Sequence, residues 1–284
     1  MLISTEIHSA AKHIGEEKAV ELVAKAGFDA WDFSMFSMVR YDWNNHCLLP
    51  NDHPLTRPDY LRFARQLRQI GEDNGIHCNQ AHAPFPNTHP GVRAYMQRAI
   101  ECMAEAGGQI LIIHPNNDAT ATQNGEFYQE LLPFAKAHGV KIAAENMWNW
   151  DTVAKHATPA ACSDPASFLA HLQAVNDPDL VACLDIGHAE MQDLGTSAVE
   201  MIHALGSHLQ ALHLHDNDRK NDSHMIPFAG KIDFAGVVQA LKEIGYRGYL
   251  TLEADTYLNT FSPDTVFTGL QNLAASVNRL RAMF

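Results

Sequence analysis

Apolar positions along the chain fall into short runs that alternate with segments of helical spacing. The short runs have the length of buried strands and lie at 2–7, 28–33, 76–81, 109–113, 140–144, 180–184, 209–214 and 249–252. Apolar residues spaced three and four apart predict helices at 16–26, 59–74, 91–106, 125–138, 163–175, up to about 205, 233–244 and 266–283. Ser163 is the expected N-cap of the helix that ends at 175.

This alternation predicts the fold class. Strands that alternate with helices indicate a parallel sheet, and eight such units close a (β/α)8 barrel. We therefore predict an α/β fold with one TIM barrel domain that spans residues 1–284. Two long segments, 34–58 and 147–163, interrupt the alternation and are candidate lids over the barrel mouth.

Composition and charge narrow the cellular context and the class of partner. The formal net charge is −13, from 20 Lys and Arg against 33 Asp and Glu, so the field around the protein repels nucleic acid. The five cysteines form no CxxC pair, which is typical of reduced thiols in a cytoplasmic protein. No apolar run reaches the ~18 residues of a membrane span, and the N-terminus does not resemble a signal peptide. We expect a cytoplasmic protein without a membrane segment.

Candidate metal ligands stand where the predicted strands end. In a (β/α)8 barrel these ends meet at one mouth, where active sites are built. Strands three to eight each end in a residue that can bind a metal: His82, His114, Glu145, Asp185, His213 and Glu253. Buried carboxylates and imidazoles without a cation would be costly, so the pattern favours a divalent metal ion. A metal-free hydrogen-bonded network is the competing interpretation.

One stretch, 209–224, carries more potential ligands than any other. Its sequence LQALHLHDNDRKNDSH supplies His213, His215, Asp216, Asp222 and His224. Imidazole and carboxylate together suit zinc, manganese, cobalt or iron. His215 points to the same side of the strand as His213 and could take its place as a ligand.

In their order along the chain, these strand-end motifs resemble those of the xylose isomerase-like TIM barrels, the group that contains sugar phosphate isomerases and epimerases and endonuclease IV. The motifs are HAPF at 82–85, IHP at 113–115, EN at 145–146, DIGH at 185–188, HLHDN at 213–217, DSH at 222–224 and LEAD at 252–255.

The resemblance to the epimerases implies a site with one divalent ion and two proton-transferring carboxylates. Its metal ligands would be Glu145, Asp185, His213 and Glu253, and its catalytic residues Glu145 and Glu253, although either Glu could be a purely structural ligand. The implied reaction is isomerisation or epimerisation of a keto sugar or related polyol through an enediolate. The resemblance also implies that His188 and Arg219 hold substrate oxygens, although a loop Arg is more often only solvated.

Aromatic residues near the mouth are further candidates for substrate contact. Trp148 and Trp150 follow Glu145 in a long loop, and Phe33 ends the second strand, where it could equally belong to the core. Few Arg or Lys accompany them, which favours a small sugar over a phosphate backbone. By analogy with related barrels we expect a homodimer.

Two other activities stay open for this barrel. The resemblance to endonuclease IV implies a zinc phosphodiesterase acting on abasic DNA, whose ligand positions also match His82, His114, His188, Asp222 and His224. However, Ala83-Pro84-Phe85-Pro86 replaces the bulky pair that enters DNA in that enzyme. The other alternative is a sugar dehydratase or lyase on the same barrel.

Overall fold

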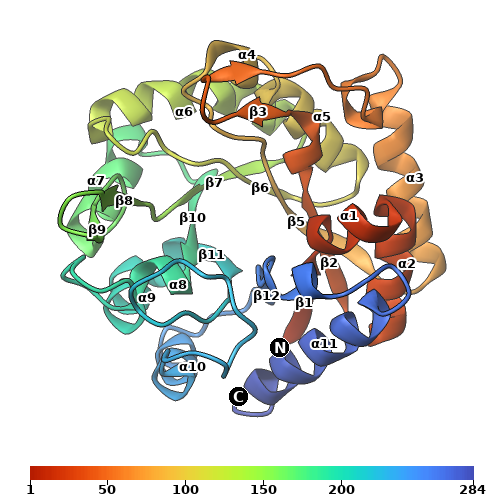
Figure 1. Cartoon of the computed structure of the whole chain (residues 1–284). Helices are drawn as coiled ribbons and strands as arrows, with labels where there is room; N and C mark the ends of the chain where they lie inside the picture. The colour runs from red at the N-terminus through yellow and green to blue at the C-terminus, as the bar shows by residue number, and fades with distance from the viewer.

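The computed structural model describes all 284 residues and is built around eight parallel strands arranged in a ring (Figure 1). In chain order the strands are β1 (Leu2–Glu6), β2 (Ala30–Ser34), β5 (His77–His82), β6 (Ile110–Ile112), β7 (Lys141–Glu145), β10 (Leu180–Asp185), β11 (Leu209–His213) and β12 (Tyr249–Leu252). Each strand through β11 pairs in parallel with the one before it, and β12 pairs with β1 from Tyr249↔Leu2 to Leu252↔Thr5. The predicted (β/α)8 barrel is confirmed.

The ring closes between β11 and β12 through an isolated parallel bridge, Leu214↔Leu252. The amide of Leu214 donates to the Thr251 carbonyl at 2.9 Å, and the amide of Glu253 donates to the Leu214 carbonyl at 3.0 Å. The other neighbouring strands pair over two or more register positions. The barrel therefore has a seam with sparse backbone pairing at β11 and β12.

Helices surround the ring of strands (Figure 1). They are α1 (His8–Ile14), α2 (Glu16–Ala26), α3 (Tyr60–Asp73), α4 (Pro90–Arg93), α5 (Met96–Glu105), α6 (Ala121–Ala137), α7 (Pro165–Val175), α8 (Ile186–Ala189), α9 (Ala198–Leu205), α10 (Phe234–Glu243) and α11 (Val266–Arg281). No helix is both long enough and apolar enough to cross a bilayer.

Three predicted helices differ from those observed. The helix expected at 91–106 is divided into α4 and α5, because the Tyr95 amide bonds the carbonyl three residues back, at Val92. Helix α6 begins at Ala121, four residues earlier than expected, because Thr120 and Gln123 form a capping box. Helix α7 is capped by Asp164 rather than Ser163, since the Asp164 carboxylate accepts the Ser167 amide at 2.9 Å.

Both long segments that interrupt the alternation contain a short antiparallel hairpin. The first contains the 3₁₀ turns η1 (Met35–Met38) and η2 (Pro54–Thr56) and the hairpin of β3 (Tyr41–Asp42) and β4 (Cys47–Leu48). The second contains the hairpin of β8 (Trp148–Asp151) and β9 (His156–Pro159). A lid role for either segment stays a prediction.

The barrel interior is apolar on one side and polar on the other. Small apolar residues of β6, β7, β10 and β11 form one cluster: Ile112, Ala143, Val181, Cys183 and Ala211. Opposite them the Asn79 amide donates to Thr251 Oγ1 at 3.0 Å, and the Gln80 amide donates to Asp32 Oδ2 at 2.9 Å. These buried polar groups are paired, so they add specificity to the barrel without orphaned donors.

Candidate active site

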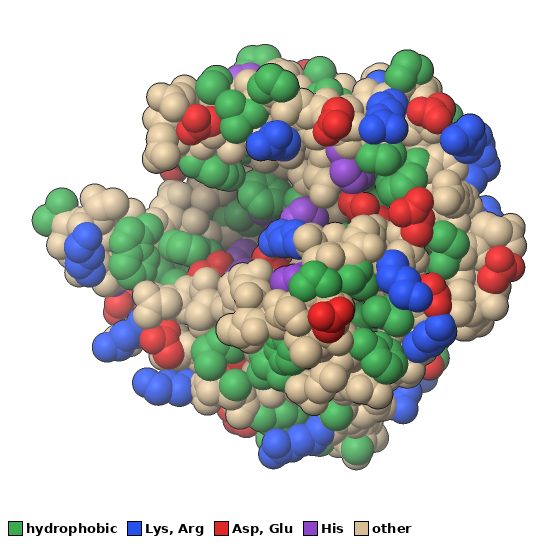
Figure 2. Space-filling model, turned by 45° about the vertical axis from the view of Figure 1, so that its right-hand side comes forward, with side chains coloured by type: hydrophobic (Ala, Val, Ile, Leu, Met, Phe, Trp, Pro, Cys, Tyr) green, Lys and Arg blue, Asp and Glu red, His purple; other side chains and the backbone are tan.

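The carboxyl ends of the strands open into a pocket with histidine side chains at its floor, shown in purple in Figure 2. The pocket has a volume of about 270 Å³. No Lys or Arg is among its lining residues, which are Phe36, His82, Phe85, His114, Glu145, Met147, Trp148, His188, Asp222, His224, Glu253 and Asp255. The predicted mouth of the barrel is therefore the place where the ligand candidates converge.

Four of these candidates form a compact group that we call the central quartet: Glu145, Asp185, His213 and Glu253. One ligand atom of each lies within 4.8 Å of the others. His213 Nδ1 lies 2.9 Å from Glu145 Oε1 and 3.2 Å from Glu253 Oε2. All four side chains are buried at the ends of β7, β10, β11 and β12. The quartet thus matches the four ligands that the family resemblance implies.

The environment of the quartet shifts its carboxyl groups in opposite directions. Burial alone would raise the pKa of Glu145, but the neighbouring His213, His114 and His82 hold it well below its ordinary value. Burial, together with the charge of Glu145, raises the pKa of Glu253 to about 8. Burial lowers the pKa of His213, but Cys183, Glu253 and Glu145 raise it well above its ordinary value. At neutral pH Glu253 and His213 therefore hold protons that a bound cation would displace.

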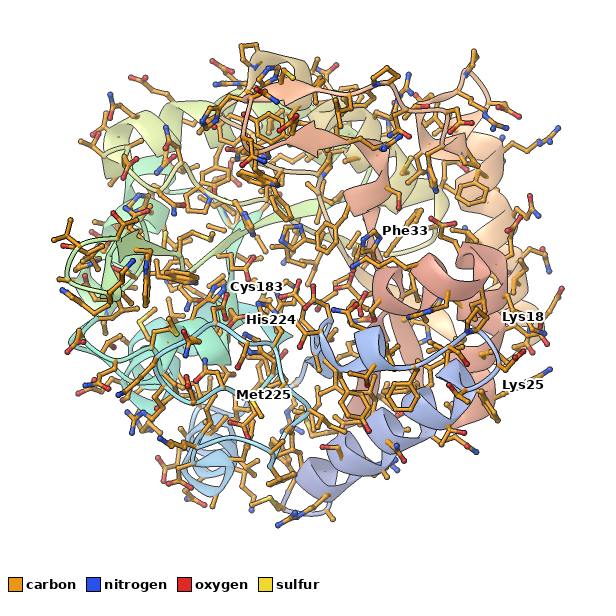
Figure 3. The ribbon with its side chains drawn as sticks, viewed as in Figure 1. Lys18, Lys25, Phe33, Cys183, His224 and Met225 are labelled. Carbon is orange, nitrogen blue, oxygen red and sulfur yellow. The ribbon has the colours of Figure 1, made fainter.

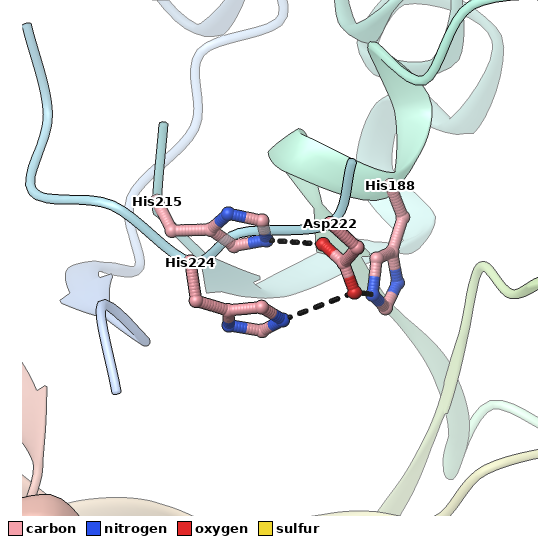
Figure 4. Close-up of side chains that lie close together, drawn as sticks. All are labelled: His188, His215, Asp222 and His224. Atoms are coloured by element: carbon pink, nitrogen blue, oxygen red, sulfur yellow. Dashed lines mark hydrogen bonds and ion pairs between the residues drawn. The ribbon is translucent and has the colours of Figure 1, made fainter. Parts of the chain in front are cut away.

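A second group lies beside the quartet and consists of His188, His215, Asp222 and His224 (Figure 4). Asp222 Oδ2 lies 3.1 Å from His188 Nε2 and 3.2 Å from His224 Nε2, and Asp222 Oδ1 lies 3.6 Å from His215 Nε2. The rings of His215 and His224 stack with centroids 3.8 Å apart. His215 fits because Gly187 has no Cβ, which would lie 1.9 Å from the imidazole.

A third group joins His82 and His114 to Glu145. The two Nε2 atoms lie 2.9 Å apart, and Glu145 Oε2 lies 3.4 Å from His82 Nε2 and 3.2 Å from His114 Nε2. The structure therefore brings together all nine ligand positions that the family resemblance implies. His215, which the sequence offers as an alternative to His213, lies 3.0 Å from Asp185 Oδ1 and connects the second group to the quartet.

Asp216 lies in the 209–224 stretch but has a structural role. Its carboxylate accepts backbone N–H groups from Asn217 at 2.9 Å, Gly230 at 2.8 Å and Ile232 at 3.1 Å. The residue is fully buried, and it holds the segment before α10 against the end of β11. Of the five potential ligands in the 209–224 stretch, Asp216 therefore stands outside the three groups.

The predicted substrate contacts are only partly met. His188 and Trp148 line the pocket, and Trp148 Nε1 donates to Asp222 Oδ2 at 3.3 Å. Trp150 packs beside Trp148 with ring centroids 6.2 Å apart but does not line the pocket. Arg219 also lies outside the lining, because its guanidinium pairs with Glu190 at 3.1 Å.

Phe33 does not reach the pocket either. It is buried in the core beside Trp31, with ring centroids 5.4 Å apart, and is labelled in Figure 3. Side chains alternate along a strand, and Asp32 faces the barrel interior, so Phe33 faces the surrounding helices. The aromatic residue at this side of the pocket is Phe36, whose ring lies 4.8 Å from that of His82.

The donor set fits a divalent metal ion. Asp185 Oδ2, in the quartet, is buried without a hydrogen-bond partner in the protein. Such atoms are costly unless something else binds them. Carboxylate oxygen and imidazole nitrogen together are the donors that manganese, zinc, cobalt and iron accept. The quartet could therefore hold one such ion, and the adjoining groups offer further ligands.

The fold and this site define the protein class as a (β/α)8 barrel with a buried centre of His and carboxylate side chains at its mouth. Comparison with known families places the chain within that class. The chain belongs to the xylose isomerase-like TIM barrel family, whose model matches residues 20–282.

Two relatives are similar to this chain in sequence. An uncharacterized protein of Methanocaldococcus jannaschii is 26% identical over 253 residues, which cover 83% of this chain and 78% of the relative. A fructoselysine 3-epimerase of Escherichia coli O157:H7 is 33% identical over 89 residues, which cover 31% of this chain and 32% of the enzyme.

Two solved structures share the fold over nearly their whole length. A D-tagatose 3-epimerase-like protein has a TM-score of 0.66 and 22% identity, with 98% of this chain and 100% of that chain covered. The IOLI protein, solved with a bound zinc atom, has a TM-score of 0.73 and 16% identity, with 100% and 99% covered.

Proposed function

We propose that this protein is a divalent-metal-dependent isomerase or epimerase of a keto sugar or related polyol. The observation that carries the proposal is the central quartet, which places two carboxylates, Glu145 and Glu253, beside the same ring nitrogen of His213, beneath a solvent-accessible pocket. Proton removal next to a carbonyl and proton return require two such groups at one carbon.

The relatives support a sugar substrate. The relative in Escherichia coli O157:H7 is named fructoselysine 3-epimerase, and a structure with the same fold is a D-tagatose 3-epimerase-like protein. The pocket supports the same conclusion, because it has aromatic and imidazole walls without a Lys or Arg residue. An uncharged, hydroxyl-rich substrate fits this lining better than a phosphorylated one.

The roles in the mechanism follow from where the side chains lie. Glu145, Asp185, His213 and Glu253 would hold the ion, which supplies Lewis-acid polarisation of a substrate carbonyl when bound. One of the two Glu carboxylates takes the proton from the carbon beside the carbonyl, and the other delivers a proton to the opposite face. Trp148 and Phe85 on the pocket wall restrict water and orient the sugar.

The test combines metal analysis with proton exchange. Protein purified without chelator should contain about one manganese, cobalt, iron or zinc per chain, and it should exchange a carbon-bound proton of a ketose with deuterated water. Glu145→Gln and Glu253→Gln should each reduce this exchange by about 10²-fold or more. Glu126→Gln, an exposed position on α6, is the matched control and should exchange at the wild-type rate. Protein that binds a ketose but exchanges no proton in the metal-loaded state would contradict the proposal.

A phosphodiesterase is the second candidate, and the two groups beside the quartet favour it. His82 and His114 on one side, and His188, Asp222 and His224 on the other, could hold additional ions. Nearly three zinc ions per chain, with cleavage of abasic DNA, would support this candidate. The absence of Lys and Arg from the pocket lining argues against it, because such side chains usually pair with the phosphates of the DNA backbone.

A further inference from the structure

A second cavity adjoins the pocket above the central quartet. It has a volume of about 370 Å³ and shares Phe85, His114 and Met147 with that pocket. Its other walls include six side chains for which we name it the amide cavity: Trp43, Asn87, Asn116, Asn117, Asp118 and Asn149. A substrate whose reacting carbon lies over the quartet can therefore extend past His114 into the amide cavity.

Trp43 offers an aromatic surface in the amide cavity. It lies on the β3–β4 hairpin, and 58% of its surface is exposed. Tyr41 contacts it edge-on with ring centroids 4.9 Å apart, and Phe85 lies 6.2 Å away on the pocket side. An indole held by other aromatic rings but open to solvent is suited to stack against the apolar face of a ligand ring.

The amides of the cavity are held in fixed positions. Asn117 Nδ2 donates to the Trp148 carbonyl at 2.9 Å and to Asn149 Oδ1 at 3.0 Å, and Asn149 Nδ2 donates to Asp118 Oδ1 at 2.9 Å. These bonds leave Asn117 Oδ1 and Asp118 Oδ2 without a hydrogen-bond donor from the protein. Pre-positioned acceptors bind hydroxyl groups with little loss of side-chain entropy.

The charge of the amide cavity selects against anionic ligands. No Lys or Arg lines it, and Asp118 is its only carboxylate. A phosphate or carboxylate would meet a negative charge without a compensating cation, whereas hydroxyl groups would meet acceptors. The combination of an indole face, fixed amides and no cation fits an uncharged sugar ring.

We propose that the amide cavity binds the second ring of a glycosylated keto sugar, so that the preferred substrate is a disaccharide or glycoside and not a free ketose. This inference rests on the proposed function for the position of the reacting unit. The second ring stacks on Trp43, and its hydroxyl groups donate to Asn117 Oδ1 and Asp118 Oδ2.

Binding measurements test the amide cavity independently of turnover. Calorimetry would compare D-fructose with maltulose, lactulose and isomaltulose, which carry a second hexose on O4 or O6 of a fructose unit. We expect at least one disaccharide to bind about tenfold more tightly than D-fructose. Trp43→Ala should weaken the binding of that disaccharide about five- to tenfold, which corresponds to the loss of one aromatic contact. The same substitution should leave the affinity for D-fructose unchanged.

Matched variants distinguish the loss of stacking on Trp43 from a general disturbance of the fold. Trp43→Phe keeps an aromatic face and should retain most of the preference for the disaccharide over D-fructose. Asp118→Ala should weaken the binding of the disaccharide several-fold. Leu49→Ala, which changes an exposed residue just after β4, should change neither affinity. Equal affinity for all four sugars, or an equal loss for D-fructose and disaccharide in Trp43→Ala, would overturn the inference.

Failure of this inference can be told apart from failure of the proposed function. Solvent proton exchange with D-fructose but no disaccharide preference would contradict only the amide cavity. Tight disaccharide binding that depends on Trp43, without proton exchange on any ketose, would contradict only the isomerase or epimerase activity.

Discussion

Glu6 is a buried carboxyl group close to the candidate site but separate from the ligand groups. It ends β1, and its carboxyl group accepts the Ser9 amide at 2.9 Å and the Ser9 hydroxyl. Burial, together with the charge of Asp255, raises the pKa of Glu6 from 4.5 to about 7. The folded protein therefore holds this proton more strongly than the unfolded chain does.

This shift predicts a pH dependence of stability. The stabilisation is fully present below the unfolded pKa of 4.5 and is lost as the pH rises through about 7. Over that range the free energy of unfolding of the wild type should fall by up to about 3 kcal/mol more than that of Glu6→Gln. Urea unfolding at several pH values measures this difference. Glu126→Gln is the control and should follow the wild type, and a Glu6→Gln profile parallel to the wild type would refute the assignment.

Side-chain chemistry at the strand ends could be predicted, but side-chain direction often could not. Six ligand candidates end predicted strands, so their place at the mouth is a consequence of strand position alone: His82, His114, Glu145, Asp185, His213 and Glu253. Phe33 and Phe36 are only three residues apart, and whether either faces the core depends on the register of β2 and on η1. Arg219 was expected at the substrate, but a tertiary contact with Glu190 decides its direction.

At the scale of the element, helix capping explains why the start of α6 differs from the sequence-based prediction. The apolar periodicity of α6 begins near 125, but the helix starts at Ala121, because the Thr120 hydroxyl accepts the Gln123 amide at 3.3 Å and the Gln123 side chain accepts the Thr120 amide at 2.9 Å. Polar residues carry this signal, so hydrophobic spacing does not show it. Hydrophobic spacing does not show the two rim hairpins either, since short strands in polar segments have little periodicity.

The capping box predicts a measurable loss. Thr120→Ala removes one hydrogen bond to the first turn of α6 and should lower the free energy of unfolding by about 1 kcal/mol. Thr120→Ser keeps the hydroxyl and should stay within a few tenths of a kcal/mol of the wild type. Urea denaturation of the three proteins provides the comparison. An unchanged Thr120→Ala would mean that the tertiary packing of α6 fixes its first turn without the cap.

At the scale of the whole molecule, the eightfold alternation of strand and helix was sufficient to predict the barrel. Parallel strands in chain order have one way to close with right-handed connections, so topology follows once the elements are known. The alternation does not show that the interior is half polar or that the amide cavity exists. Both depend on side chains from segments far apart in sequence, such as Trp43 and Asn117.

Metal removal should destabilise the whole barrel. An ion that binds only the folded state at about a hundred times its dissociation constant contributes about 2.7 kcal/mol. Chelation with EDTA followed by dialysis should therefore lower the melting temperature by roughly 5–10 °C. Addition of manganese or zinc should restore it, and magnesium, which prefers all-oxygen ligands, should restore less. A melting temperature that is the same before and after chelation would contradict a metal bound at the quartet.

The central quartet lies across the seam between β11 and β12, and this position has a consequence for the stability of the ring. His213 precedes the single bridge on one side, Glu253 follows it on the other, and their side chains face each other 3.2 Å apart. An ion held by both would act as a noncovalent cross-link over the part of the ring that has the fewest backbone bonds. Occupancy of the site would then control local opening of the barrel, and amide exchange at Leu214 and Glu253 would report it before any loss of overall fold.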